Sequence, residues 1–163
     1  MTIKGRNIFR GYTLVEVVVI IIIVGIITAI VTPKIFSITR GNEAENVDEM
    51  LQKLEIGLTT YSNKQFIDNQ PIVIHNPFED ITVLPENYRG EVKTINSINI
   101  PDGCWVWRST GNWIMYNPKS SIEGGWLNSD ESYIIYQVQP IMEHGTTVGL
   151  RLTTTDTYKY IWK

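Results

Sequence analysis

The hydrophobic pattern begins with an almost uninterrupted apolar run near the N-terminus. From Val17 to Val31 every residue is apolar except one glycine and one threonine, and Leu14 extends the run backwards. Leu14 to Val31 is 18 residues, which would measure about 27 Å as a helix, close to the ~30 Å hydrocarbon core of a membrane. A lone segment in lipid must satisfy its own backbone hydrogen bonds, which favours a helix over a strand. The run therefore predicts a transmembrane helix over about residues 14–32.

A second apolar pattern, with helical spacing, follows Pro33. Its members recur at intervals of three and four residues: Ala44, Val47, Leu51, Leu54, Leu58 and Tyr61. Charged residues lie off this stripe, where we expect exposure to solvent: Glu43, Glu45, Asp48, Glu49, Lys53 and Glu55. Because the helical pattern resumes, Pro33 is expected to kink the helix rather than end it. The two patterns predict one helix from about Thr13 to Asn63, whose stripe packs on a globular domain or, alternatively, in a coiled coil.

After about residue 64 the pattern changes to short apolar segments separated by Pro, Asn, Asp and Gly, which is typical of strands and loops. The strand candidates are Ile72–Ile74, Ile81–Leu84, Cys104–Arg108, Trp113–Tyr116, Tyr133–Gln139, Val148–Thr154 and Tyr158–Trp162. The clearest hairpin joins two of them through the turn Ser109–Asn112. We therefore predict an α+β fold, in which the helix of residues 12–64 packs on a small antiparallel sheet formed by residues 65–163.

Aromatic residues are concentrated in this second part. All five tryptophans lie in residues 105–162, and Trp105 and Trp107 share one face of a strand by the period of two. Packing in the core or at a subunit interface is one interpretation. A platform for a ligand is the other.

Composition adds charge and redox information. The chain has a net charge of −3, so nucleic-acid binding is not expected. Residues 1–11 carry Lys4, Arg6 and Arg10 and no acidic residue. This basic start predicts a cytoplasmic N-terminus, with the rest of the chain on the outer side of a single span. Cys104 is the single cysteine, so an internal disulfide is excluded, and we expect a small buried hydrophobe there.

Chemistry-bearing residues do not form a catalytic pattern. His75 and His144 are far apart without metal-ligand spacing, and we expect both at the surface. The sequence has no G-x-S-x-G motif and no phosphate-binding loop. An enzyme is therefore not predicted, and no cofactor is expected.

The segment before the apolar run carries a resemblance to a known family. Gly11-Tyr-Thr-Leu-Val-Glu16, after a short basic leader, resembles the prepilin peptidase site of type IV pilins and type II secretion pseudopilins. The resemblance implies removal of residues 1–11 by cleavage between Gly11 and Tyr12, followed by N-methylation of Tyr12. Gly25 and Pro33 also fall where this family commonly places the glycine and proline at which the helix bends.

Glu16 then acquires a role in assembly. An ionised carboxylate at membrane depth needs a partner or a functional reason. Cleavage would create an α-amine on Tyr12, four residues before Glu16 and on the same helical face. In a filament, the resemblance implies that the amine of a neighbouring subunit pairs with Glu16 and fixes the axial register. A glutamate that merely reaches the membrane interface is the alternative.

The family further implies other subunits as partners, together with an inner-membrane assembly platform and the lipid bilayer. The expected location is the bacterial inner membrane, with a periplasmic head, and then a pilus or pseudopilus. Many type IV pilins close a C-terminal loop with a disulfide, which Cys104 alone cannot form. Trp105–Tyr116 and Tyr160–Trp162 resemble minor pilin-like proteins of mannose-sensitive haemagglutinin pilus systems.

Some pseudopilins bind calcium near the C-terminal sheet. By that resemblance, Asn128, Asp130 and Glu131 are candidate calcium ligands, because hard oxygen ligands suit this ion. The leading hypothesis for the whole chain is a structural subunit, a minor pilin or pseudopilin. The alternative is a membrane-tethered module whose aromatic head recognises a surface, a sugar or DNA.

Overall fold

The computed structural model describes residues 13–93, 100–128 and 131–163. The chain divides into two compact units, Met1–Thr39 and Arg40–Lys163. One helix, α1 (Leu14–Ile67), contributes to both. The predicted long helix is therefore confirmed, and it ends four residues later than its expected end.

The part of α1 in the first unit is apolar and unpacked. The side chains described from Leu14 to Ile35 are all exposed, Leu14 at 80% and Val31 at 41%. Among the described residues, α1 is the one helix long and apolar enough to cross a membrane. The helix continues through Pro33, as predicted, while a kink at this proline stays a prediction.

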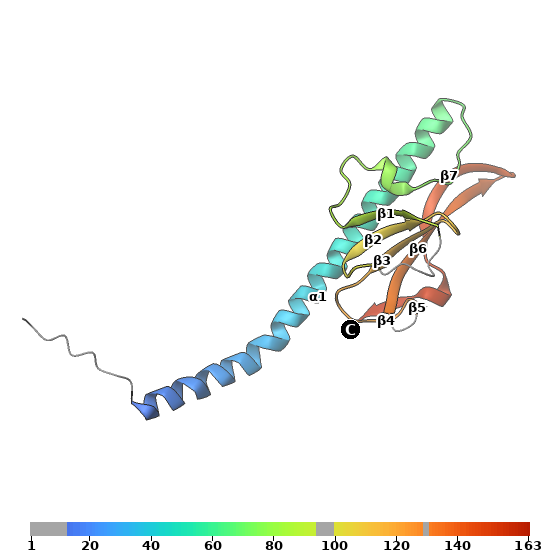
Figure 1. Cartoon of the computed structure of the whole chain (residues 1–163). Coiled ribbons are helices and arrows are strands. Elements are labelled where there is room, and N and C mark those ends of the chain that lie inside the picture. Colours follow the sequence, from blue (N-terminus) through green and yellow to red (C-terminus); the bar gives the residue numbers. More distant parts are fainter. Residues whose placement is uncertain (1–12, 94–99, 129–130) are drawn as a thin grey trace, which may run out of the picture. The chain divides into compact units, whose positions relative to one another are not determined.

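The second unit, which we call the head, contains the rest of α1 and a mostly antiparallel sheet (Figure 1). The sheet has the order β1-β2-β3-β6-β5, with β7 also paired to β6. The strands are β1 (Tyr88–Val92), β2 (Cys104–Arg108), β3 (Trp113–Asn117), β5 (Trp126–Asn128), β6 (Glu131–Glu143) and β7 (Thr146–Thr153). A two-stranded sheet of β4 (Ile122–Gly124) and β8 (Tyr160–Trp162) accompanies it.

The predicted hairpin forms as expected. β2 and β3 pair antiparallel from Cys104↔Asn117 to Arg108↔Trp113, and the amide of Asn112 donates to the carbonyl of Ser109 across the turn. One pairing differs from the prediction, because β1 runs parallel to β2. A parallel pair cannot be joined by a two-residue hairpin, and eleven residues separate Val92 from Cys104 in the sequence.

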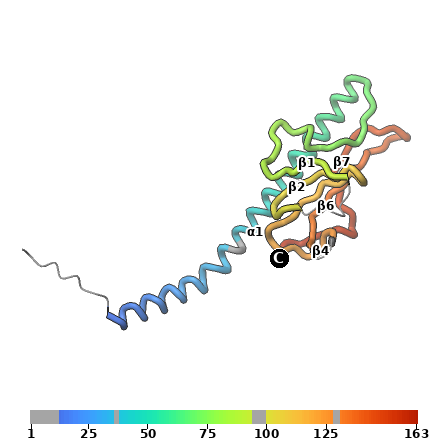
Figure 2. Tube along the Cα trace, in the orientation of Figure 1, coloured from blue at the N-terminus to red at the C-terminus, as the bar shows by residue number. Residues whose placement is uncertain are grey.

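Two strand predictions between α1 and β1 are wrong. Residues 72–76 have no regular structure, and residues 81–83 form bends after a short 3₁₀ helix, η1 (Pro77–Asp80), with no strand at Leu84. Figure 2 shows this connection running from the end of α1 back along the helix to β1. Pro71 and Pro77 interrupt it, and proline cannot donate the hydrogen bond that a strand ladder needs. Its apolar residues Ile72, Ile74 and Ile81 instead pack against the core.

Two apolar clusters cover the two faces of the sheet. On one face, Val47, Leu51, Leu54 and Leu58 of the α1 stripe pack against strand residues that include Trp105. Leu54 and Leu58 are 0% exposed, which confirms that the stripe packs within the head. The other face holds Ile100, Cys104, Val106, Met115, Tyr133 and Ile135. Both faces of β2 are therefore buried.

Candidate functional site

The start of α1 is organised around Thr13 and Glu16. The backbone amide and the hydroxyl of Thr13 both donate to Oε2 of Glu16, each at 2.8 Å, and the amide of Glu16 donates to the Thr13 hydroxyl at 3.3 Å. This reciprocal arrangement is a capping box, which satisfies amides that have no partner in the first helical turn. The T-x-x-E spacing of Thr13 and Glu16 is the sequence signal from which this cap could have been predicted.

The cap gives Glu16 a polar partner within the chain. Glu16 is exposed, and its carboxylate accepts hydrogen bonds from the backbone amide and the hydroxyl of Thr13. Gly11 and Tyr12, the predicted cleavage and methylation positions, lie outside the described residues. The pairing of Glu16 with an amine on Tyr12 therefore stays a prediction.

The polar residues within the apolar run satisfy their own hydrogen bonds. The hydroxyl of Thr28 donates to the carbonyl of Val24 at 2.8 Å, and that of Thr32 donates to the carbonyl of Thr28 at 2.7 Å. A hydroxyl bonded in this way costs less in lipid than a free one. A side chain at Gly25 would meet nothing within 4 Å, so packing within this chain does not require glycine there.

The head contains a buried carboxylate that we expected in solvent. Glu43 is only 8% exposed. Its Oε1 accepts from the Tyr116 hydroxyl at 2.8 Å and from the Lys119 amide at 2.7 Å, while its Oε2 accepts from the Ser120 amide at 2.9 Å. The expectation of an exposed Glu43 is therefore wrong, because the loop after β3 folds over the helix and supplies donors. The other charged residues off the stripe are exposed, as expected: Glu45, Asp48, Glu49, Lys53 and Glu55.

Opposing effects act on the titration of this carboxylate. Burial raises the pKa of Glu43, but hydrogen bonds from Ser120, the Lys119 amide and Tyr116 together outweigh it and leave the pKa below its usual value. Burial, with the adjacent Glu43, also raises the pKa of Tyr116. The phenol thus keeps its proton and donates to an ionised carboxylate. The arrangement fixes the loop after β3 to α1.

The tryptophans belong mainly to the packed interior. Trp105 and Trp107 are each 3% exposed and lie in the cluster on the α1 side of the sheet, which confirms the core interpretation for this pair. The three half-buried tryptophans each lie beside a tyrosine ring, with centroid distances of 5.7 Å for Trp113–Tyr158, 5.8 Å for Trp126–Tyr133 and 6.0 Å for Trp162–Tyr160. Each of these tryptophan rings therefore packs against a tyrosine ring of the same chain.

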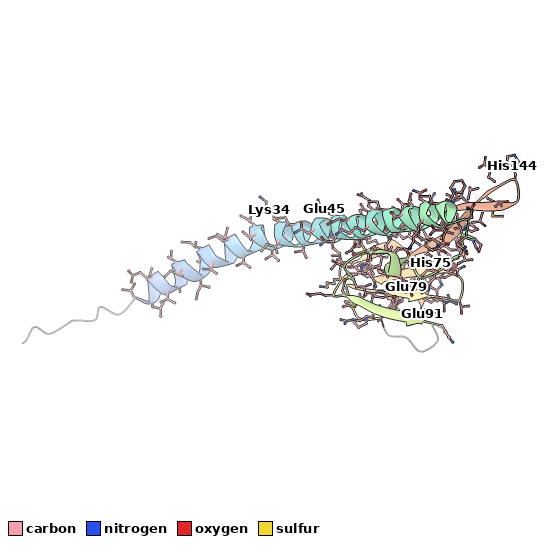
Figure 3. All side chains as sticks on the ribbon, turned by 90° about the horizontal axis from the view of Figure 1, so that it is seen from above. Lys34, Glu45, His75, Glu79, Glu91 and His144 are labelled. Carbon is pink, nitrogen blue, oxygen red and sulfur yellow. The ribbon has the colours of Figure 1, made fainter. Side chains whose placement is uncertain are left out.

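Cys104 and the histidines have distinct environments. Cys104 is 4% exposed and accepts a hydrogen bond from Nε of Arg89 at 3.3 Å, which confirms a buried position. His144 is exposed at the tip of the β6–β7 hairpin, as expected (Figure 3). His75 is not a surface residue, because its side chain is only 20% exposed and bonds to Asp80. No periodic pattern or motif in the sequence links His75 to Asp80.

The candidate calcium ligands are only partly described. The backbone of Asn128 pairs with Glu131 between β5 and β6, but the side chain of Asn128 and all of Asp130 lie outside the described residues. The carboxylate of Glu131 accepts a hydrogen bond from the Tyr133 hydroxyl. Within the part of the chain that is described, no three His, Cys, Asp or Glu side chains come together in a way that could hold a metal ion.

The described residues form an α+β protein, in which a capped helix, apolar and long enough in its first part to cross a membrane, continues into a mostly antiparallel head. Residues 6–32 match the family model described as the prokaryotic N-terminal methylation motif. This match and the α+β layout support membership of the type IV pilin and pseudopilin family. No curated protein and no solved structure matches the chain.

Proposed function

We propose that the chain is a structural subunit, a minor pilin or pseudopilin, that is stored in the inner membrane and assembled into a filament. The N-terminal methylation motif over residues 6–32 is the observation that carries this proposal. Before assembly, lipid would cover the exposed apolar part of α1. In the filament, the same side chains would pack against neighbouring helices.

Processing by prepilin peptidase fits the arrangement of the N-terminal segment. Removal of residues 1–11 would take away Lys4, Arg6 and Arg10, which hold the uncut chain at the cytoplasmic face. It would also create the amine on Tyr12 that pairs with Glu16 of a neighbouring subunit. An unpaired charge in any other register is costly in low dielectric, so this pair would select the register.

The head gives the filament subunit its stable outer part. The Glu43 contacts, the core around Leu54 and the tryptophan packing all serve stability within one chain. This supports a structural, non-enzymatic role. The alternative of an aromatic binding module gains no support, because each half-buried tryptophan lies against a tyrosine. The mannose-sensitive haemagglutinin-type system and a calcium site at Asn128, Asp130 and Glu131 stay predictions.

Mass spectrometry of the protein extracted from membranes tests the assignment. We expect an N-terminal peptide that begins at Tyr12 and carries one added methyl group. Cells that lack prepilin peptidase provide the control and should give a chain that still contains residues 1–11. The leader contains a second glycine, Gly5, so a mature chain that starts at Arg6 would contradict the cleavage site. An uncut chain in cells with active peptidase would contradict the proposal itself.

A further inference from the structure

The last ten residues of the chain, 154–163, run as a strap along one edge of the head. Residues 154–157 are all exposed, and a short 3₁₀ helix, η2 (Asp156–Tyr158), leads into β8. Figure 1 shows the C-terminus beside β4. Among the described strands, β8 pairs only with β4, in a two-stranded sheet separate from the six-stranded one. The strap therefore shares no ladder with the main sheet.

Few polar contacts hold the strap closed. The β4–β8 ladder contains three residue pairs. Two hydrogen bonds flank it, from the Gly125 amide to the carbonyl of Lys159 at 3.0 Å and from the Lys163 amide to the carbonyl of Ser121 at 2.9 Å. The ion pair between Lys163 and Glu123 is exposed on both sides, and such a pair adds little stability. Loss of this one short ladder would free the strap.

The side chains of the strap are only partly buried. None of its ten residues is fully buried, and its three aromatic residues are half-buried. Tyr158 lies edge-on to Trp113 of β3, with centroids 5.7 Å apart, while Tyr160 and Trp162 pack at the margin of the core. A half-open cavity has Tyr158 and Trp113 among its lining residues. Because unfilled space removes contacts from the side chains around it, this cavity weakens the hold on the strap.

The close fit of the strap depends on a glycine of β4. Gly124 has a φ of 86°, and a Cβ at this position would collide with the carbonyl oxygen of Lys159. Gly145, in the turn of the β6–β7 hairpin, has a similar φ of 82°, but a Cβ there would meet nothing within 4 Å. Both positions favour glycine for the same backbone reason. They differ in that only Gly124 touches the strap.

We propose that residues 154–163 open and close as a unit while the six-stranded sheet stays folded. The sheet contains residues that are 0% exposed, such as Ile114 and Ile134, whereas the strap has no buried residue. A segment with few buried apolar contacts opens at a lower free energy than the rest of its domain. Opening leaves the edge of β4 unpaired and removes Tyr158 from Trp113. This inference concerns the head alone and does not rest on the proposed function.

Amide exchange of the full chain in detergent micelles tests the strap. The Gly125 amide reports on the strap, because it donates to Lys159. The amides of Trp105 and Val138 report on the sheet, since each donates a hydrogen bond of 2.9 Å and each residue is at most 3% exposed. We expect the protection of Gly125 to be at least about tenfold lower and to change little in dilute urea, because local opening exposes little surface. Equal protection of all three amides would overturn the proposal.

A reversible lock separates strap opening from other causes of exchange. Bonded pairs alternate along an antiparallel ladder, so the bonds of Gly125 and Lys163 make Glu123 and Ile161 the bonded pair between them, with Cα atoms about 5.5 Å apart. A disulfide spans this separation, and both side chains are exposed. In Glu123→Cys/Ile161→Cys, formation of the disulfide should raise the protection of Gly125 at least about tenfold, and its reduction should reverse the change. Unchanged protection in the disulfide form would overturn the proposal.

Two glycine variants provide the opposite change and its control. Gly124→Ala places a Cβ against the carbonyl of Lys159, so it should lower the protection of the Ile161 amide relative to that of Trp105 at least about fivefold. Gly145→Ala imposes similar backbone strain without touching the strap and should leave this ratio unchanged. An equal change of the ratio in both variants would show that the strap does not open as a separate unit.

Discussion

Replacement of Glu16 by glutamine is expected to remove the chain from assembled filaments while leaving the start of its helix intact. Glutamine can occupy the fourth position of a capping box, so it keeps an acceptor for the Thr13 amide. What it loses is the negative charge. If that charge pairs with the amine of a neighbouring Tyr12, its loss leaves the amine unpaired in low dielectric, at a cost of about 3 kcal/mol. Incorporation should then fall by about a hundredfold.

The cap and the charge can be tested separately at this site. Thr13→Val removes the hydroxyl that bonds to Glu16 but keeps the carboxylate, whereas Thr13→Ser keeps both. We expect Thr13→Ser to assemble like the unaltered chain, and Thr13→Val to lose much less than Glu16→Gln. The measurement is the amount of subunit in sheared filaments relative to the amount in membranes. Normal incorporation of Glu16→Gln would contradict the charge-pair role of this residue.

Periodic patterns made much of the fold predictable from the sequence. The 3-4 spacing from Val47 to Leu58 gave the packed side of α1, and the alternation around the turn Ser109–Asn112 gave the β2–β3 hairpin. Both signals arise from the geometry of one element, so neighbouring residues carry them. The N-terminal unit was predicted from local signals too. The apolar run indicated a membrane-spanning helix, and the Gly11–Glu16 segment carried the resemblance to pilins.

The sequence predictions that proved wrong have a common physical origin, which is contact between residues far apart in the sequence. Glu43 is off the apolar stripe, yet Tyr116 lies 73 positions later and donates to it. The apolar residues Ile72–Ile74 suggested a strand, but they pack against the core as part of an irregular loop. Pro71 and Pro77 flank them, and proline cannot donate the backbone hydrogen bond that pairing with a neighbouring strand needs. His75 and Asp80 are close in sequence, but Tyr61 of α1 and the core beneath Phe78 give the pair its shielding. No local period encodes such contacts.

The loop after β3 should lose its hold on α1 when Glu43 is changed. Glu43→Ala leaves the Tyr116 hydroxyl and the amides of Lys119 and Ser120 without their acceptor. Hydrogen bonds to a charged group are worth about 1.5–3 kcal/mol, and orphaned buried donors add to the loss. We therefore expect the free energy of unfolding of the head to fall by about 3 kcal/mol. Tyr116→Phe removes one donor to the charged group and should cost about 1.5–2 kcal/mol.

Denaturation of the full chain in detergent, followed by tryptophan fluorescence, measures this effect. Glu45→Gln is the matched control, because Glu45 lies two residues away on the same helix and is exposed. It lies on the side of α1 away from the sheet (Figure 3), and we expect its unfolding midpoint to stay at the value of the unaltered chain. Equal midpoints for Glu43→Ala and Glu45→Gln would contradict the structural role of Glu43.

The pH dependence of Glu43→Gln provides an independent test of the charge. The hydrogen bonds hold the pKa of Glu43 below its usual value despite burial, so the folded head binds this proton less readily than the unfolded chain does. The resulting stabilisation is present above the usual glutamate pKa of about 4.3 and is lost as the pH falls through the lower folded value. The difference in stability between the unaltered chain and Glu43→Gln should thus be largest near about pH 7 and shrink toward about pH 3, because protonated glutamate and glutamine carry the same charge. A difference that stays constant over this range would mean that shape, rather than the ionised carboxylate, holds the loop on the helix.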